Sequence, residues 1–398
     1  MRNRLDRNKF FYKCYTISSQ SLFIWTIFLI YLRGKGLSFT EVMVLNSLSA
    51  VITFVFEVPS GILADKLNRK SLLVLGEVLR CLSLCIILFT NNYCILLFSS
   101  AFSGLAESMI SGSGIALIYD SFLEEKKEEE YKQYLANTQM WALRFSAFAT
   151  LVSGVLYKFN FNLPMILSII LEIFSIVFLL RLKDTKVINF SNININLKEI
   201  FVEERNNIIG LRNNKYVLKL FFIYFVMMIL ISNLNYTSQA YLTDIGISYS
   251  YIGIIFFIFS IISSFGAKSS AKVKFRSRVI IFWYCLVLIG LYFSGIYISL
   301  ILLAIARFMS GMIWPILSDE TNKVIDSNNR ATILSYRSLI SQISFIIFDP
   351  LVGLLLDKLG FKFTYVIMGT CTLGILSLVL LFKILKNKTK INYTNINE

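Results

Sequence analysis

Long apolar runs follow one another along almost the whole chain, and they decide which folds are open to it. A helix needs about 20 apolar residues to cross the hydrocarbon layer of a bilayer. We find twelve runs of that length, with short polar gaps between them, near residues 11–32, 40–63, 71–90, 93–122, 136–157, 163–182, 216–241, 249–268, 278–296, 298–323, 331–356 and 361–383. We therefore predict an all-α integral membrane protein with twelve transmembrane helices.

The composition argues against a soluble fold. Hydrophobic residues make up 56% of the 398 residues and charged residues 16%, whereas soluble domains average about 45–50% and about 25%. A globular core cannot hide this much apolar surface, because surface grows too steeply with chain length. The first run follows a basic segment, MRNRLDRNKF. Because that run can span a bilayer and no small-residue cleavage site follows it, we expect a retained helix rather than a signal peptide.

The polar gaps predict the orientation and the domains. Lys and Arg gather in alternate gaps, so the positive-inside rule places both termini in the cytoplasm. The longest gap divides the runs six and six, and two matched halves are typical of secondary transporters built from repeats. We predict a six-helix bundle over 1–182, a cytoplasmic linker over 183–215, a second six-helix bundle over 216–385 and a disordered cytoplasmic tail over 386–398.

Several function classes are not supported. The net charge is +15, but its place in short loops argues against a nucleic-acid partner. The chain has no histidine, and its six cysteines lack the spacing of a metal site or a disulfide framework, so we expect no metal. Nucleotide-binding and hydrolase motifs are absent from the sequence, so we expect neither an enzyme nor a bound cofactor. Any proton chemistry would depend on carboxylates, with a proton gradient as the energy source.

The turn after the second run, GILADKLNRK at 61–70, has a specific pattern. It resembles the signature loop of the major facilitator superfamily, G-x-L-[AG]-D-[RK]-x-G-R-[RK], with Asn68 at a glycine position. Asn is the residue after glycine that best tolerates a left-handed backbone. The resemblance implies that superfamily's fold of two pseudo-symmetric halves. It also implies a latch that joins the halves in the outward-open state, made here by Gly61, Asp65, Lys66, Arg69, Lys70 and Asp120.

The physical chemistry of this loop agrees with a latch. Asp65 and Asp120 lie at helix C-termini, where the helix dipole disfavours an acid unless a cation is close. We expect Arg69 to pair with Asp120. Ordinary anchoring at the inner membrane surface is the alternative; it explains Lys66 and Lys70 but not Asp65 or Gly61.

A second resemblance covers the end of the fourth run, SGSGIALIYDSF at 111–122. The drug-exporter-like branches of the superfamily carry a similar S-G-x-x-x-A-L-x-Y-D pattern. These branches often have an acidic residue where this chain has Gly114 or Ile115. Their coupling mechanism therefore does not transfer directly.

Ionisable residues inside the predicted spans are the other candidates, because each costs at least about 2.5–3.5 kcal/mol near the bilayer centre. Glu77 and Arg80 lie three apart, so they can neutralise each other or bind substrate. Asp349 precedes Pro350 and can bind a proton or satisfy donors freed by a helix bend. Glu172 is a further acid, on the sixth run.

Glu107 on the fourth run and Arg307 on the tenth form the sharpest pair of candidates. By resemblance these runs line a central cavity, so the two side chains could face it from opposite halves. Glu107 is then a proton or cation site. The alternative is a structural ion pair between Glu107 and either Arg144 or Arg80.

We prefer proton-coupled efflux by an antiporter, with a small lipophilic compound or drug as substrate. We expect a monomer in a bacterial cytoplasmic membrane, since Ile, Lys and Asn are abundant as in AT-rich bacterial genomes. One alternative is an uptake permease or uniporter for a nutrient, with Glu107 and Arg307 as its binding pair. Another is a sensor or channel-like protein without a transport cycle, for which no output domain or pore-lining pattern is visible.

Overall fold

All elements in the described part of the chain are helices, which confirms the predicted all-α class. The computed structural model describes residues 4–66, 69–183, 215–270, 272, 277–322 and 330–396. In the first half lie α1 (Arg4–Gln20), η1 (Trp25–Ile27), α2 (Phe28–Gly34), α3 (Phe39–Lys66), α4 (Arg69–Phe89), α5 (Tyr93–Glu124), α6 (Glu128–Phe159) and α7 (Leu163–Leu180). In the second half lie α9 (Lys215–Asp244), α10 (Tyr249–Ser270), α11 (Ser277–Phe293), α12 (Ile296–Asn322) and α13 (Arg330–Ile396).

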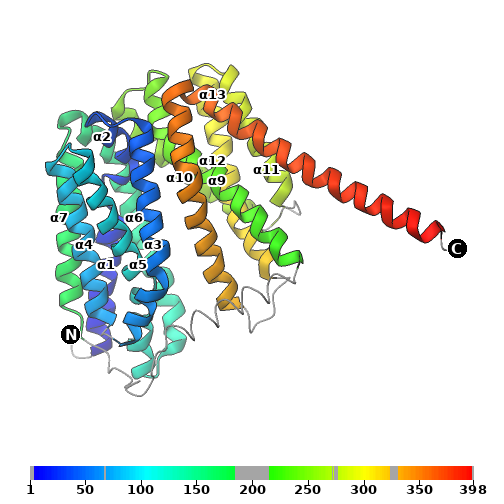
Figure 1. Cartoon of the computed structure of the whole chain (residues 1–398). Helices are drawn as coiled ribbons and strands as arrows, with labels where there is room; N and C mark the ends of the chain where they lie inside the picture. Colours follow the sequence, from blue (N-terminus) through cyan, green and yellow to red (C-terminus); the bar gives the residue numbers. More distant parts are fainter. Residues whose placement is uncertain are drawn as a thin grey trace.

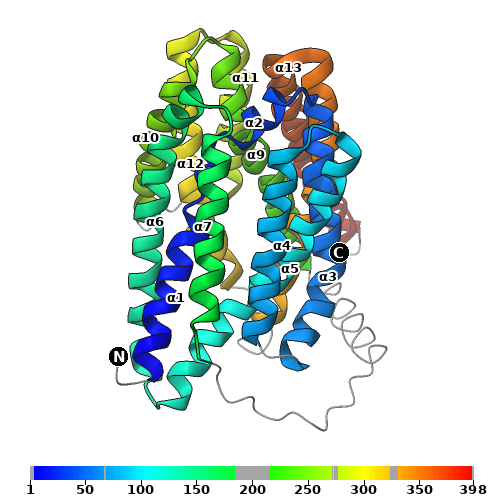
Figure 2. The ribbon, with the colours of Figure 1, turned by 90° about the vertical axis from the view of Figure 1, so that its left-hand side faces the viewer.

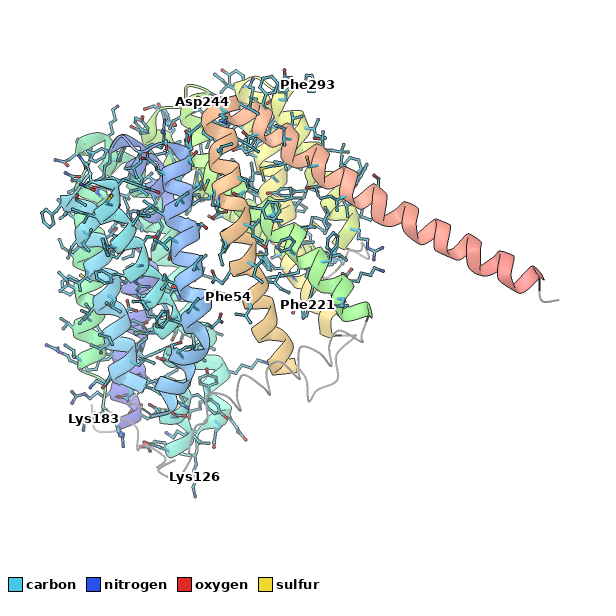
Figure 3. All side chains as sticks on the ribbon, viewed as in Figure 1. Phe54, Lys126, Lys183, Phe221, Asp244 and Phe293 are labelled. Carbon is cyan, nitrogen blue, oxygen red and sulfur yellow. The ribbon has the colours of Figure 1, made fainter. Side chains whose placement is uncertain are left out.

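The helices run up and down between two ends of a bundle (Figures 1 and 2). We call the end that carries the N-terminus the inner end; Lys126 and Lys183 mark it in Figure 3. The opposite, outer end is marked by Asp244 and Phe293. The sequence predicts that the inner end is cytoplasmic.

The predicted first span is interrupted rather than continuous, because α1 stops at Gln20 and η1 and α2 complete the crossing. Serines near the break bond to their own helix: Ser18 Oγ donates to the Cys14 carbonyl at 2.9 Å. Such bonds compete with a regular helix. Past the break, the Ile24 N–H donates to Ser168 Oγ of α7 at 3.0 Å, so the freed backbone is partly satisfied.

The number of spans is only partly visible. Within the described residues, ten helices are long and apolar enough to cross a membrane, and Ser277–Phe293 is a shorter apolar helix. One of the ten, Leu339–Ser377, contains Gly360, whose φ of 74° and ψ of 177° break the helix. This break separates the two last predicted spans, and Figure 1 shows the chain changing direction within α13. The count of twelve itself stays a prediction.

Two further predictions concern the linker between the halves and the C-terminal tail. The predicted linker covers 183–215, of which 184–214 lie outside the described residues. In the structure α13 continues to Ile396, which differs from the disordered tail predicted for 386–398. Extending an existing helix costs much less than starting one, and an apolar helix precedes this Lys- and Asn-rich end.

Among the described residues, the main contacts between the two halves are made by two helix pairs, α3 with the first part of α13 and α6 with α10; α2 also touches α9, and η1 touches α10. Figure 1 shows the first of these pairs side by side. In the second pair two glycines allow close approach: a Cβ on Gly154 would lie 2.2 Å from the Tyr249 carbonyl oxygen, and one on Gly253 would lie 2.4 Å from that of Leu151. Small residues let helix backbones approach in this way. Both contacts lie in the outer halves of their helices, so the bundle is closed at its outer end.

Candidate functional site

A cavity of about 500 Å³ lies between the two halves, below the outer closure. The first half contributes the break after α1 and one turn of α3, and the second half contributes α9, α10 and α13. Aromatic rings, amides and one carboxylate form its walls. The lining residues are Trp25, Thr26, Asn46, Ser232, Asn233, Asn235, Tyr236, Gln239, Phe256, Phe345 and Asp349.

Helix α9 presents hydrogen-bond acceptors to this cavity. The amide nitrogens of Asn233 and Gln239 each donate at 3.0 Å to a carbonyl of their own helix, of Ile229 and Tyr236 respectively. Their side-chain oxygens, and that of Asn235, have no hydrogen-bond partner among the described residues. A buried polar group without a partner is costly, so these three oxygens can gain from a ligand that donates.

Asp349 belongs both to the cavity and to the contact between halves. Its carboxylate is buried and accepts a hydrogen bond from Asn46 Nδ2 of α3. One turn away, Ser47 Oγ donates to the Ile346 carbonyl at 2.9 Å. Any separation of α3 from α13 must break both bonds, so the state of this carboxylate is tied to the closure.

Nearer the outer end, Asp357 of α13 caps the start of α3. It accepts from the backbone N–H of Phe39 at 2.9 Å and from that of Thr40 at 2.7 Å, and the Thr40 hydroxyl donates to it at 2.6 Å. The free N–H groups at a helix start favour a carboxylate. This cap comes from the other half of the molecule, so it exists only while the outer end is closed. Asp357 was not among the residues predicted from the sequence, because no motif around it marks such a role.

A buried charged cluster lies within the first half, on α1, α4 and α7. Arg80 lies 2.5 Å from Glu77 Oε2, which confirms that these two residues pair. Arg80 also donates to both carboxylate oxygens of Glu172, at 2.9 and 3.3 Å. The Tyr15 hydroxyl donates to Glu77 Oε1 at 2.7 Å. Glu172 was recognised in the sequence as an acid on the sixth run. Its pairing with Arg80 was not predicted, because spacing along one helix cannot reveal a partner on another helix.

A second cavity, of about 120 Å³, lies beside the central one and reaches one member of this cluster. Arg80 lies in its wall together with serines of α4 and α5. Both cavities share three lining residues: Trp25, Asn46 and Tyr236.

The predicted latch residues are partly visible. Arg69 of α4 pairs with Asp120 of α5, as the sequence predicts. Lys70 Nζ donates to the Leu182 carbonyl at 2.7 Å and so ties α4 to the end of α7. These contacts stay within the first half. Gly61, Asp65 and Lys66 lie in α3, but their side chains are outside the described part, so the latch role stays a prediction.

Glu107 and Arg144 are both exposed, on α5 and α6. Arg144 lies over the Trp141 ring, 5.1 Å from its centroid. In the residues that the structure describes, no ion pair joins Glu107 to Arg144, Arg80 or Arg307. The structure thus does not form the pairs that the sequence suggests for this acid.

Arg307 supports the cavity wall from behind. Its guanidinium donates to the Asn235 carbonyl at 3.3 Å and to Ser238 Oγ at 3.0 Å, both on α9. It also lies 4.9 Å from the centroid of the Phe256 ring. It therefore fixes two elements that line the cavity without itself lining it.

Comparisons with known proteins agree with this geometry. The family model described as Major Facilitator Superfamily matches residues 13–348 and 220–394. The uncharacterised MFS-type transporter YxaM of Bacillus subtilis (strain 168) is 23% identical over 235 residues, which are 58% of this chain and 57% of that relative's length.

Two solved structures share the fold at low sequence identity. The nucleoside transporter NupG superposes with a TM-score of 0.75 at 13% identity, over 96% of this chain and 99% of that one. A bacterial homologue of the human lysosomal transporter Spinster, in an inward-facing and occupied conformation, gives 0.71 at 11% identity, over 96% of each chain.

Proposed function

The chain belongs to the Major Facilitator Superfamily and is a multi-pass membrane transporter, and on that premise we propose that it exports a small amphipathic compound by proton-coupled antiport. The membrane would be a bacterial cytoplasmic one, with both termini in the cytoplasm. The observation that carries the proposal is the cavity between two halves that are joined at their outer end only by contacts that can break.

Transport then proceeds by alternating access. In this proposal the structure corresponds to the state closed to the outside, and the compound enters the cavity from the inner end. Export requires the outer contacts to open, including the Asn46–Asp349 bond and the Asp357 cap. The predicted latch, with Arg69 and Asp120, would join the halves at the inner end in that second state.

The lining of the cavity favours a particular class of compound. Trp25, Tyr236 and Phe256 offer ring surfaces, and the three amide oxygens of α9 offer acceptors. A compound with an aromatic ring and several N–H or O–H donors fits both features, and Asp349 adds a preference for a cation. This lining is more polar than a purely lipophilic substrate needs.

The same amides favour a second candidate, uptake of a polar nutrient. Acceptors without partners discriminate strongly for a solute that donates to them, since a solute lacking donors leaves them unsatisfied. This alternative reverses the direction of transport but keeps the cavity and the cycle.

Ethidium, a cationic aromatic dye with amino groups, is a suitable probe. Inverted membrane vesicles containing the protein should accumulate it under an imposed pH gradient and lose it when an ionophore collapses the gradient. Gln239→Leu should reduce accumulation, because it removes an acceptor of the cavity, and Gln133→Leu at an exposed position of α6 should not. Equal accumulation in vesicles without the protein would contradict export, and gradient-driven growth on one nutrient would favour uptake.

A further inference from the structure

The buried cluster on α1, α4 and α7 has one feature that ion pairing alone does not explain. It contains two carboxylates but only one guanidinium. Glu77 and Glu172 are 0% exposed, and Arg80 contacts both. With both acids ionised the cluster carries a net charge of −1 in the interior of the bundle.

Among the side chains that the structure describes, the surroundings supply no second cation. The other titratable groups that act on the cluster are Tyr12 and Tyr15 of α1 and Cys81 and Cys85 of α4, all neutral in their ordinary state. In the described parts of α5 and α6, which also pack against these helices, no charged side chain pairs with any member. An uncompensated buried charge costs several kcal/mol, so neutralisation by a proton is strongly favoured.

The hydrogen bonds show where a proton fits. One guanidinium serves both acids: Arg80 Nε donates to Glu172 Oε1 at 2.9 Å, while Nη2 lies 3.3 Å from Glu172 Oε2 and 2.5 Å from Glu77 Oε2. Glu77 receives a hydrogen bond at Oε1 from Tyr15, and among the described residues its buried Oε2 has only the Arg80 contact, which it shares with Glu172. Two coupled carboxyls share such a proton, and it belongs to the pair rather than to either residue.

We propose that Glu77, Arg80 and Glu172 form the site that binds the exchanged proton, an assignment that rests on the proposed transport function. The proton binds a carboxylate as H⁺ and leaves as H⁺, so no bond other than O–H forms or breaks. Arg80 lies in the wall of the small cavity, which shares Trp25, Asn46 and Tyr236 with the central one. A compound that displaces those shared side chains can shift Arg80 between the two acids and so change proton affinity.

Infrared difference spectroscopy of the purified full-length protein tests this without any substrate. The wild type near neutral pH should show the carbonyl stretch of one protonated, buried carboxyl, which disappears at high pH. Glu77→Gln and Glu172→Gln should each lose this band, because either change leaves one acid paired with Arg80. Glu129→Gln, at an exposed position of α6, and Asp349→Asn should retain it.

If either Glu77→Gln or Glu172→Gln fails to fold, the infrared test can be made with the other variant alone. No band in the wild type, or a band that persists in both cluster variants, would overturn the assignment, as would a band lost only in Asp349→Asn. Ethidium assays form a separate arm: Glu77→Gln should lose gradient-driven accumulation but keep exchange of the dye without a gradient. If the protein moves no ethidium at all, the export proposal fails while the infrared result still decides the proton site.

Discussion

Closure of the outer end depends on two glycines, and replacing either by alanine should open it. Gly154 of α6 and Gly253 of α10 belong to different halves and face each other's backbone. An added Cβ would lie 2.2 Å from the Tyr249 oxygen in the first case and 2.4 Å from the Leu151 oxygen in the second. Ordinary contacts begin near 3.4 Å, so the two helices would have to separate by about 1 Å, because a carbonyl cannot rotate away as a side chain can.

The expected size of the effect follows from the cost of overpacking, typically about 1–3 kcal/mol. The contact exists only while the outer end is closed, so the cost falls on that state alone. A value of about 2 kcal/mol corresponds to a change of about 30-fold in the ratio of outer-closed to outer-open molecules. Gly253→Ala should therefore raise the open population relative to the closed one by about 30-fold.

Pulsed electron paramagnetic resonance can measure this shift. Spin labels at Phe159, at the end of α6, and Tyr297, at the start of α12, would report the distance between the halves, since both side chains are 82% exposed at the outer end. The native cysteines are first replaced by serine. We expect one short distance in the parent protein and a longer one in Gly253→Ala.

Matched controls come from glycines that pack within one half. A Cβ on Gly311 would lie 1.9 Å from the Ser263 oxygen, and one on Gly266 would lie 2.1 Å from that of Phe308. Alanine at either position should lower thermal stability without changing the distance between labels. The reasoning is refuted if Gly253→Ala keeps the parent distance or if Gly311→Ala lengthens it equally.

Three further predictions concern other contacts. Asp357→Ala removes the cap of α3 and should favour the open state by about 1 kcal/mol, or about fivefold, in the same resonance assay; an unchanged population would show that the cap does not stabilise closure. Arg69→Gln and Asp120→Asn should each lower the melting temperature, and the double variant should lose less than the sum of the two, because they share one ion pair; strictly additive losses would contradict the pairing. Asn233→Leu should raise the KM for ethidium more than it lowers the maximal rate, since it removes a ground-state acceptor; an unchanged KM would exclude this amide from binding.

Much of the fold follows from patterns within single helices. The apolar runs have the length of a membrane crossing, and the family pattern at 61–70 is local. The Glu77–Arg80 pair is also local, because residues three apart on a helix are neighbours. The Arg69–Asp120 pair was predictable because both ends lie at the same rim and each dipole end needs compensation.

Other features depend on how the helices pack, and sequence alone does not give that. Glu172 completes the cluster from α7, at a separation of 92 positions from Arg80. Asp357 lies 318 positions from the helix start that it caps. The facing of Glu107 toward Arg307 stays a prediction for the same reason: the sequence places a helix beside a cavity, but only packing decides how that helix is rotated. The partner that satisfies the Ile24 N–H after the break, Ser168, also lies on another helix.

The central claim is that the cavity is open to one side of the membrane at a time. A single cysteine at Ser232, in the cavity wall, tests it in a protein whose native cysteines are replaced, using a membrane-impermeant thiol reagent on oriented vesicles. The account predicts labelling from the inner side alone in this background, and labelling from the outer side when Gly253→Ala is added. Labelling from both sides within the same protein, without that second change, would indicate a continuous pore and contradict alternating access.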